Sequence, residues 1–178
     1  MGQITGDQPV SDEIRQAIRQ LLEEHSTITL ATTDGERLWA TAVFFASDME
    51  LNLYFVSDRR TRHGRNLAAN ARVAGAISAN CTTWSEIRGL QLEGNVTVLE
   101  ELARLSALKI YLAKFPDVSS LMERPRDKNE KTIATRLREA RIYRLSPEWI
   151  RLIDNSKGFG YKEEVTLHDT RTEDESLV

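Results

Sequence analysis

The feature that most constrains the fold of this chain is a series of β-rich segments joined by short polar turns. In the first part of the chain these segments are 27–33, 38–46, 51–56, 73–78 and 87–99. Between the first two, Asp34-Gly35 is typical of a tight β-hairpin turn. The longest segment contains Gly89 and Gly94, and glycines inside a strand indicate bulges or close backbone approach. Long, bent strands in such a series predict a closed antiparallel barrel instead of an open sheet.

The rest of the chain predicts helices that flank this barrel and strands that close it. A helix that begins at Ser11 carries apolar residues on one face, which should pack against the core. A second amphipathic helix is expected over 100–115, ended by Pro116, with an apolar stripe that suits either the core or a subunit interface. The residues of that stripe are Leu102, Leu105, Leu108, Leu112 and Phe115. Closing strands are predicted over 140–145, 149–153 and 162–167.

Length and composition set bounds on the domain organisation. A chain of 178 residues with 40% hydrophobic and 29% charged residues is typical of one globular unit, so we expect a single domain over 1–178. The two ends, 1–10 and 168–178, are polar and should be loose tails. The charged segment 117–131, which Pro125 interrupts, is predicted to be a mobile loop.

Charge, cysteine and histidine content exclude several classes of function. The net charge of −3 gives no general attraction to nucleic acid, so any basic cluster acts locally. The lone Cys81 allows neither an internal disulfide nor a cysteine-rich metal site, and the histidines show no metal-ligand spacing. The N-terminus lacks the apolar segment of a signal peptide, and no apolar run reaches membrane-spanning length. We therefore expect a soluble, cytoplasmic protein that binds neither nucleic acid nor membranes.

One turn concentrates groups that could bind a phosphorylated ligand. The strand over 51–56 ends in a polar turn, and Thr61 then stands where a helix N-cap belongs. Four basic residues crowd the same turn: Arg59, Arg60, Arg62 and His63. A helix start offers unpaired backbone N–H groups and positive dipole density, which together with guanidinium groups favour a terminal phosphate. The same residues also suit an ordinary solvated basic turn with a threonine cap, so both interpretations stay open.

The order and spacing of these segments resemble the FMN-binding split barrel of the pyridoxamine 5′-phosphate oxidase-like superfamily. The resemblance is carried by LATTDGERLWATAVFFASDMELNLYFVSDRRTRHGRNLAANARVAGAI at 30–77, by IRGLQLEGNV at 87–96 and by IYRLSPEWIRLID at 142–154. Family features in these stretches are a first hairpin with a glycine turn, a strand that ends in an aromatic pair, and a hydroxyl-and-basic turn before a helix. The segment DNSKGFG at 154–160 resembles the smaller YhbP-like branch of bacterial proteins.

This resemblance implies a mainly β fold with flanking helices, a dimeric antiparallel split β-barrel of Greek-key type, and FMN as the cofactor. The flavin would lie in the groove between two subunits of a homodimer, with its phosphate against the helix start. Its ring would run along the backbone of the 41–45 strand, with 88–91 on a neighbouring strand. The cofactor-binding residues implied in this way are Thr41, Ala42, Val43, Phe44, Phe45, Val56, Ser57, Arg60, Thr61, Arg62, His63, Arg88 and Gln91.

Departures from the family pattern narrow the activity that the resemblance implies. His63 occupies the position of a common turn lysine, so binding of the phosphate would depend on the nearby arginines. The strand 41–46 lacks the basic residues of the vitamin B6 oxidases, so that reaction is not expected. We expect instead an FMN-dependent oxidoreductase, similar to flavin reductases, whose redox substrate the sequence does not name. Because the flavin carries the redox chemistry, no side chain is singled out as catalytic.

Residues near the C-terminal end of the chain are candidates for contact with the flavin ring. Phe159 lies between Gly158 and Gly160, which let the backbone bend, so its side chain could cover the flavin edge. Lys157 and Trp84 could also approach the ring. Each of these three side chains has an ordinary structural interpretation as well, namely a packed aromatic ring or a solvated lysine.

The alternative function is a non-catalytic split-barrel module for binding or sensing. Such a barrel could hold haem, the deazaflavin coenzyme or no cofactor. Haem would require an axial ligand, for which His63 and His168 are the candidates.

Overall fold

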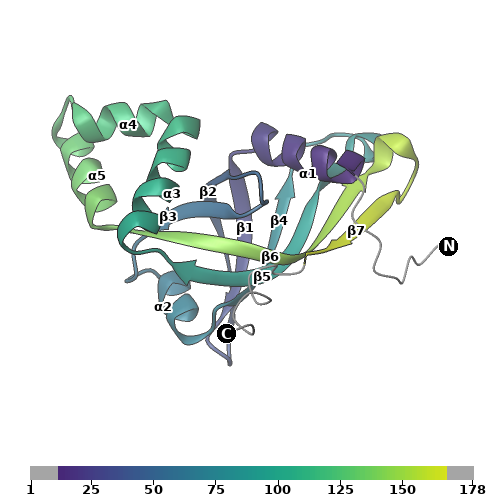
Figure 1. Ribbon diagram of the computed structural model, residues 1–178, viewed down its shortest axis with the longest axis horizontal. Helices are drawn as coiled ribbons and strands as arrows, with labels where there is room; N and C mark the ends of the chain where they lie inside the picture. The colour runs from purple at the N-terminus through teal and green to yellow at the C-terminus, as the bar shows by residue number, and fades with distance from the viewer. Residues whose placement is uncertain (1–11, 168–178) are drawn as a thin grey trace, which may run out of the picture.

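Six antiparallel strands form a closed barrel, as the sequence predicts, in the computed structural model, which describes residues 12–167 (Figure 1). Around the barrel the strands are β3 (Leu53–Ser57), β2 (Leu38–Ser47), β1 (Thr27–Thr33), β4 (Arg72–Ser78), β5 (Arg88–Val98) and β6 (Arg141–Asp154). Pairing of β3 with β6 closes the ring, and β7 (Lys162–Thr166) pairs with β6 as an added strand. The predicted split barrel with flanking helices is thus confirmed. The predicted tails, 1–10 and 168–178, and Ser11 lie outside the described residues.

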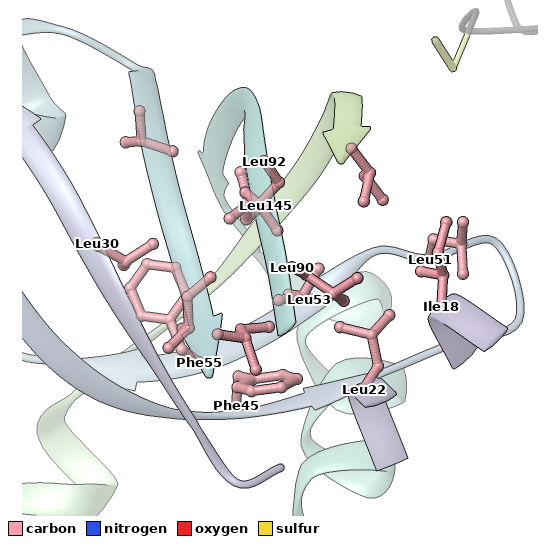
Figure 2. Close-up of a cluster of buried hydrophobic side chains, with 14 of the residues drawn as sticks. Ile18, Leu22, Leu30, Phe45, Leu51, Leu53, Phe55, Leu90, Leu92 and Leu145 are labelled. Atoms are coloured by element: carbon pink, nitrogen blue, oxygen red, sulfur yellow. The ribbon is translucent and has the colours of Figure 1, made fainter. Parts of the chain in front are cut away.

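Buried apolar residues alternate with exposed residues along the strands, and the apolar ones fill the interior of the barrel. On β1, Ile28 and Leu30 are buried, while Thr29 between them faces solvent. Figure 2 shows the cluster that results, in which leucines from several strands surround Phe45 and Phe55. The polar-apolar alternation read from the sequence therefore specifies which face of each strand enters the core.

Different helices cover the two ends of the barrel (Figure 1). α1 (Asp12–Glu24) packs on one end through the apolar stripe expected from the sequence, of which Ile18, Leu21 and Leu22 are buried. α2 (Arg62–Ala69) lies at the opposite end, where Leu67 is buried and the Asn66 side chain donates a hydrogen bond of 3.2 Å to Thr32 of β1. The basic turn singled out in the sequence therefore lies at the α2 end.

A bulge lets β6 run as one strand where the sequence predicts two. The register of β5 and β6 shifts at Gly94, as expected for a glycine inside a strand, and a Cβ there would overlap the backbone of Ser146. Pro147 lies at this irregularity, where a residue without an N–H group is tolerated. The prediction of separate strands over 140–145 and 149–153 is therefore wrong.

The segment between β5 and β6 folds into three helices, so the prediction of a mobile loop over 117–131 is wrong. These helices are α3 (Glu101–Lys114), α4 (Pro116–Glu123) and α5 (Lys128–Glu139), which stand beside β3 in Figure 1. Pro116 begins α4 instead of only ending α3, because the first helical position needs no N–H group. Asp127 caps α5 by accepting the backbone N–H of Glu130 at 2.8 Å.

The apolar stripe of α3 does not enter the core along its whole length. Leu102 and Leu105 are 78% and 61% exposed, whereas Ala107 and Tyr111 are the buried residues of this helix. The core interpretation is therefore wrong for these two leucines. The interface interpretation stays a prediction.

Candidate functional site

The candidate site is built where β3 ends and α2 begins. The Thr61 hydroxyl accepts the backbone N–H of Gly64 at 3.1 Å, which confirms Thr61 as the N-cap of α2. The same hydroxyl donates to the carbonyl oxygen of Asp58 at 2.7 Å. A Cβ at Gly64 would lie only 2.6 Å from that carbonyl oxygen. A glycine at this position therefore lets the turn approach the helix start closely.

A buried imidazole lies between two hydroxyl groups of this turn. Nε2 of His63 is 2.5 Å from the Ser57 hydroxyl and 3.2 Å from the Thr61 hydroxyl. Because Thr61 gives its proton to Asp58, the contact favours the tautomer in which His63 donates from Nε2. Burial lowers the pKa of His63, so the ring is neutral at pH 7. In this tautomer the Ser57 hydroxyl can donate its proton either to the Thr61 hydroxyl, 3.5 Å away, or to a ligand oxygen.

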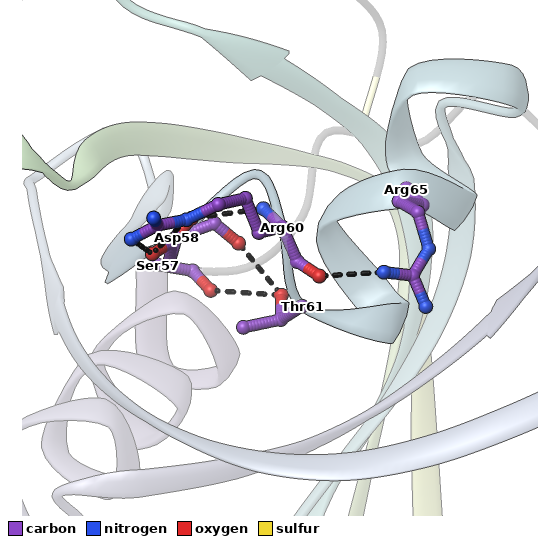
Figure 3. Close-up of polar contacts among 5 residues, drawn as sticks. All are labelled: Ser57, Asp58, Arg60, Thr61 and Arg65. Atoms are coloured by element: carbon purple, nitrogen blue, oxygen red, sulfur yellow. Dashed lines mark hydrogen bonds and ion pairs between the residues drawn. The ribbon is translucent and has the colours of Figure 1, made fainter.

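The arginines of the turn differ in whether they already form an ion pair with a carboxylate. Arg60 folds back on Asp58 with 2.6 Å between nitrogen and oxygen, and these hydrogen bonds lower the pKa of the Asp58 carboxyl to about 2 (Figure 3). Arg65 donates to the backbone carbonyl of Arg60 at 2.6 Å. Arg62 instead lies over the Trp39 ring, 4.5 Å from its centroid, and has no ion-pair partner among residues 12–167.

These groups together fit a phosphate monoester. A phosphate dianion requires hydrogen-bond donors and compensating positive charge, and the start of α2 supplies both N–H groups and the positive end of the helix dipole. Arg62 adds a guanidinium that no carboxylate of the described residues neutralises, and Ser57 adds a hydroxyl. Arg60 has less charge to offer because Asp58 already holds it. His63 contributes hydrogen bonding without charge.

The candidate residues on β2 divide between the two faces of that strand. Thr41 and Val43 are half-buried and Phe45 is fully buried, so these three side chains face the barrel interior. Ala42 and Phe44 are exposed on the outside, where Phe44 packs edge-on against an aromatic ring at the end of α3. A ligand on the outer surface of β2 would therefore meet two of these side chains and only the backbone of the other three.

Three further candidates lie away from the start of α2. Val56 lines a cavity beneath α3 and α5, on the outside of β3. Gln91 lies on the outer face of β5 in the same lateral row as Ala42, with β1 and β4 between them. Arg88 lies at the α1 end of the barrel, where its guanidinium is 3.4 Å from the Glu24 carboxylate. Within one chain, the structure does not bring Arg88 to the basic turn.

Some contacts at these places were not visible in the sequence. Trp39 and Arg62 meet because α2 packs against β1 and β2, and no local sequence pattern connects them. Trp84 and Phe159 pack edge-on, with ring centroids 5.7 Å apart, in the short connections beside Arg88. These two rings therefore lie toward the α1 end of the barrel, not beside the basic turn.

Two other kinds of site are absent from the described part of the chain. Residues 12–167 contain no cluster of three or more His, Cys, Asp or Glu side chains that could hold a metal ion. Over the same range no helix is both long enough and apolar enough to cross a lipid bilayer.

Similarity to known sequences connects the chain with one family. The family model for pyridoxamine 5′-phosphate oxidase matches residues 14–154. A relative from Serratia proteamaculans, described as a UPF0306 protein, is 28% identical over 161 residues, which cover 90% of this chain and 97% of that protein. The match thus spans the barrel, α2 and the three helices between β5 and β6.

Solved structures with the same fold include proteins described in different terms. A heme binding protein from Mycobacterium smegmatis superposes with a TM-score of 0.66 at 19% identity, over 89% of this chain and 60% of that chain. A candidate pyridoxamine 5′-phosphate oxidase from Listeria innocua superposes with a TM-score of 0.60 at 18% identity, over 79% of this chain and 98% of that one. At these identities the likeness shows the fold alone.

Proposed function

This chain belongs to the pyridoxamine 5′-phosphate oxidase family, and we propose that it is an FMN-binding flavoprotein. The observation that carries the proposal is the turn at the start of α2, where Arg62 has no carboxylate partner among the described residues. FMN differs from riboflavin by a terminal phosphate, so an anion site at a helix start is the feature that would select it.

In the proposed complex the phosphate accepts hydrogen bonds from Arg62, from the Ser57 hydroxyl and from the first backbone N–H groups of α2. Thr61 keeps its role as the N-cap, and His63 holds the two hydroxyls in place. The flavin ring would lie along the outer surface of β2, whose backbone is accessible beside the small side chain of Ala42. The chain's own groups thus bind and orient the cofactor.

As the activity, we propose an oxidoreductase similar to flavin reductases. FMN, when bound, supplies hydride or electron transfer. The outer face of β2 presents Ala42 and Phe44 and no basic side chain, so a second phosphorylated substrate such as a vitamin B6 phosphate has no charge partner there. An uncharged or apolar redox substrate suits this surface better.

We also propose that two copies of the chain form a homodimer with the flavin between them. Leu102 and Leu105 on α3 and Phe44 on β2 are all more than half exposed, and α3 packs beside β2. Groups of large apolar side chains on a protein surface mark interfaces. A second copy that covers this face would remove the apolar surface from water and would enclose the ring of the flavin.

A haem-binding module is the second candidate function, because the heme binding protein from Mycobacterium smegmatis has the same fold. Haem iron requires an axial ligand from the protein. Nε2 of His63 already contacts the hydroxyls of Ser57 and Thr61, so ligation would break both contacts. His168 lies outside the described residues. The geometry therefore favours a flavin, and the visible spectrum of the purified protein separates flavin bands from a haem band.

Replacement of Arg62 by alanine tests the phosphate site directly. Loss of a charge-assisted hydrogen bond should weaken FMN binding by about 1.5–3 kcal/mol. The affinity for riboflavin, which has no phosphate, should hardly change. Arg60→Ala is the matched comparison in the same turn and should weaken FMN binding less, because Asp58 already holds that guanidinium. Quenching of flavin fluorescence measures each of these affinities.

An Arg62→Ala protein that binds FMN as tightly as the original chain would overturn the phosphate assignment. Equal losses for FMN and riboflavin would also contradict it, because they would mean that Arg62 supports the fold or the ring instead of the phosphate. A colourless protein that does not quench added FMN would favour a module without flavin chemistry.

A further inference from the structure

The three helices α3, α4 and α5 line a partly open cavity of about 220 Å³ on the outer face of β3 and β6. Val56 and Ile142 form its floor on the two strands. Its walls are mainly apolar side chains of the helices, including Leu108, Leu112 and Met122. Ligand pockets are typically clefts lined mainly by apolar side chains with a few polar groups, and this lining has that character.

Arg104 of α3 is a half-buried charged group in the cavity wall. Its Nε atom is buried and has no hydrogen-bond partner among the described residues, nor does its guanidinium form an ion pair with any of them. Buried N–H groups in folded proteins almost always have a partner. A guanidinium also stays charged at any ordinary pH, so it cannot lower its cost by losing a proton.

The other polar groups of the cavity do not neutralise Arg104. Arg138 reaches the cavity from α5, but its guanidinium donates to the backbone carbonyl of Met122 at 2.5 Å. Tyr111 contributes a hydroxyl that forms no hydrogen bond within residues 12–167. No aspartate or glutamate lines the cavity. The wall thus combines an apolar surface with an uncompensated positive charge.

We propose that this cavity binds a small carboxylic acid with an apolar body, and that the carboxylate pairs with Arg104. Arginine matches a carboxylate with two parallel hydrogen bonds. The volume exceeds that of a cavity of about 150 Å³ that holds benzene, and lies below the roughly 300–1,000 Å³ of drug-sized ligand pockets. A single ring or a medium-length alkyl chain therefore fits the space.

This site is separate from the proposed phosphate turn. Val56 faces outward from β3 toward the helices, whereas the next residue, Ser57, is buried and contacts His63. The backbone of β3 lies between the two places, because successive side chains of a strand point to opposite faces. The proposal consequently does not depend on flavin binding.

Isothermal titration calorimetry on the full chain, without added flavin, tests the proposal by measuring the affinities for two probes, octanoate and 1-octanol. Octanoate should bind at least tenfold more tightly than octanol, because only octanoate offers a charge to Arg104. Arg104→Gln should remove that preference and leave octanol binding unchanged. Leu108→Trp should fill the cavity and weaken both probes. Lys109→Gln removes one charge from the same helix at a residue that does not line the cavity. This control should change the affinity for neither probe.

Several results would overturn the proposal. Equal affinity for octanoate and octanol would show that the cavity does not recognise an anion. Octanoate binding that survives Arg104→Gln, or that Lys109→Gln removes equally well, would assign the anion contact elsewhere. No binding of either probe to the original chain would reject the site altogether. Circular dichroism of each variant confirms that a loss of binding does not reflect a loss of fold.

Discussion

Replacing Gly64 with alanine should destabilise this protein, against the usual preference of helices for alanine. Gly64 lies in the first turn of α2, and within a helix alanine is normally favoured over glycine by about 1 kcal/mol. Here a Cβ would lie 2.6 Å from the carbonyl oxygen of Asp58 and 2.9 Å from both the Cα and the carbonyl oxygen of Arg59. All three are backbone atoms, so none can rotate away as the end of a side chain would.

The steric cost of this substitution should exceed the gain in helix propensity. Overpacking costs about 1–3 kcal/mol, and three close backbone contacts place this position at the upper end of that range. After the gain of about 1 kcal/mol from propensity, the net loss is about 2 kcal/mol. For a domain of this size, such a loss corresponds to a fall in Tm of about 4–8 °C. Because the turn beside Asp58 must move, FMN affinity should fall too.

Urea unfolding of Gly64→Ala and Ala68→Gly measures the two effects in the same helix. Ala68 is exposed, so Ala68→Gly reports the ordinary propensity difference and should lose about 1 kcal/mol. Both variants should therefore be less stable than the original chain, although they change glycine and alanine in opposite directions. A Gly64→Ala protein that is as stable as the original chain, or more stable, would refute the close approach of turn and helix.

Two further predictions concern the buried imidazole and the surface of α3. Because burial lowers the pKa of His63, the unfolded chain binds that proton more readily, so stability should fall as the pH drops below the ordinary histidine value of about 6.5. Urea unfolding across this pH range should show that His63→Gln loses less stability in acid than the original chain does. An equal loss of stability would contradict the lowered pKa of His63. Leu105→Glu should convert the proposed dimer to monomers in light scattering, whereas Lys109→Glu should not. An original chain that is already monomeric at micromolar concentration would rule out that dimer.

The strands could be predicted because their signals are local in the sequence. On β1 the alternation of Ile28 and Leu30 with threonines gives both the strand and its buried face, and the observed bounds equal the predicted 27–33. The turn at Asp34-Gly35 joins β1 to β2 as expected. Each of these features depends on residues within a few positions of one another, so no knowledge of the tertiary structure was needed.

The helices between β5 and β6 were harder to predict, because hydrophobic periodicity does not distinguish a polar helix from a loop. α5 buries only Ala134 among its twelve residues, which leaves almost no apolar stripe to detect. Capping signals were nevertheless present. Pro116 suits a first helical position, and Asp127 with Glu130 forms an N-cap contact of a common kind. Interpreting the prolines of this segment only as breakers produced the error.

The candidate site was predictable only where its contacts are local. The cap between Thr61 and Gly64 spans three residues, so the sequence indicates it directly. Arg62 lies over Trp39 of another strand and has no carboxylate partner among the described residues, and both facts follow from the tertiary structure. The basic cluster in the sequence therefore indicated positive charge, but not which arginine keeps that charge available for a ligand.

The positions of the implied cofactor residues give a physical reason to expect a second copy of the chain at the flavin. Along β2, the path from Trp39 to Ala42 leads away from α2, and the lateral row of Ala42 continues through β1 and β4 to Gln91 on β5. Arg88 lies farther still in the same direction. Measured along β5, Arg88 is about six residues, or about 20 Å, from the residue of β5 that lies in the same lateral row as Trp39.

A side chain at one end of the barrel cannot reach a phosphate that is held at the other end. For Arg88 to contact the same phosphate as Arg62, it must therefore come from a second copy of the chain. Light scattering of the dimer and FMN binding by Arg62→Ala therefore test two parts of the same proposed complex. Tight FMN binding by a strictly monomeric protein would leave Arg62 in the phosphate site and would remove Arg88 from it.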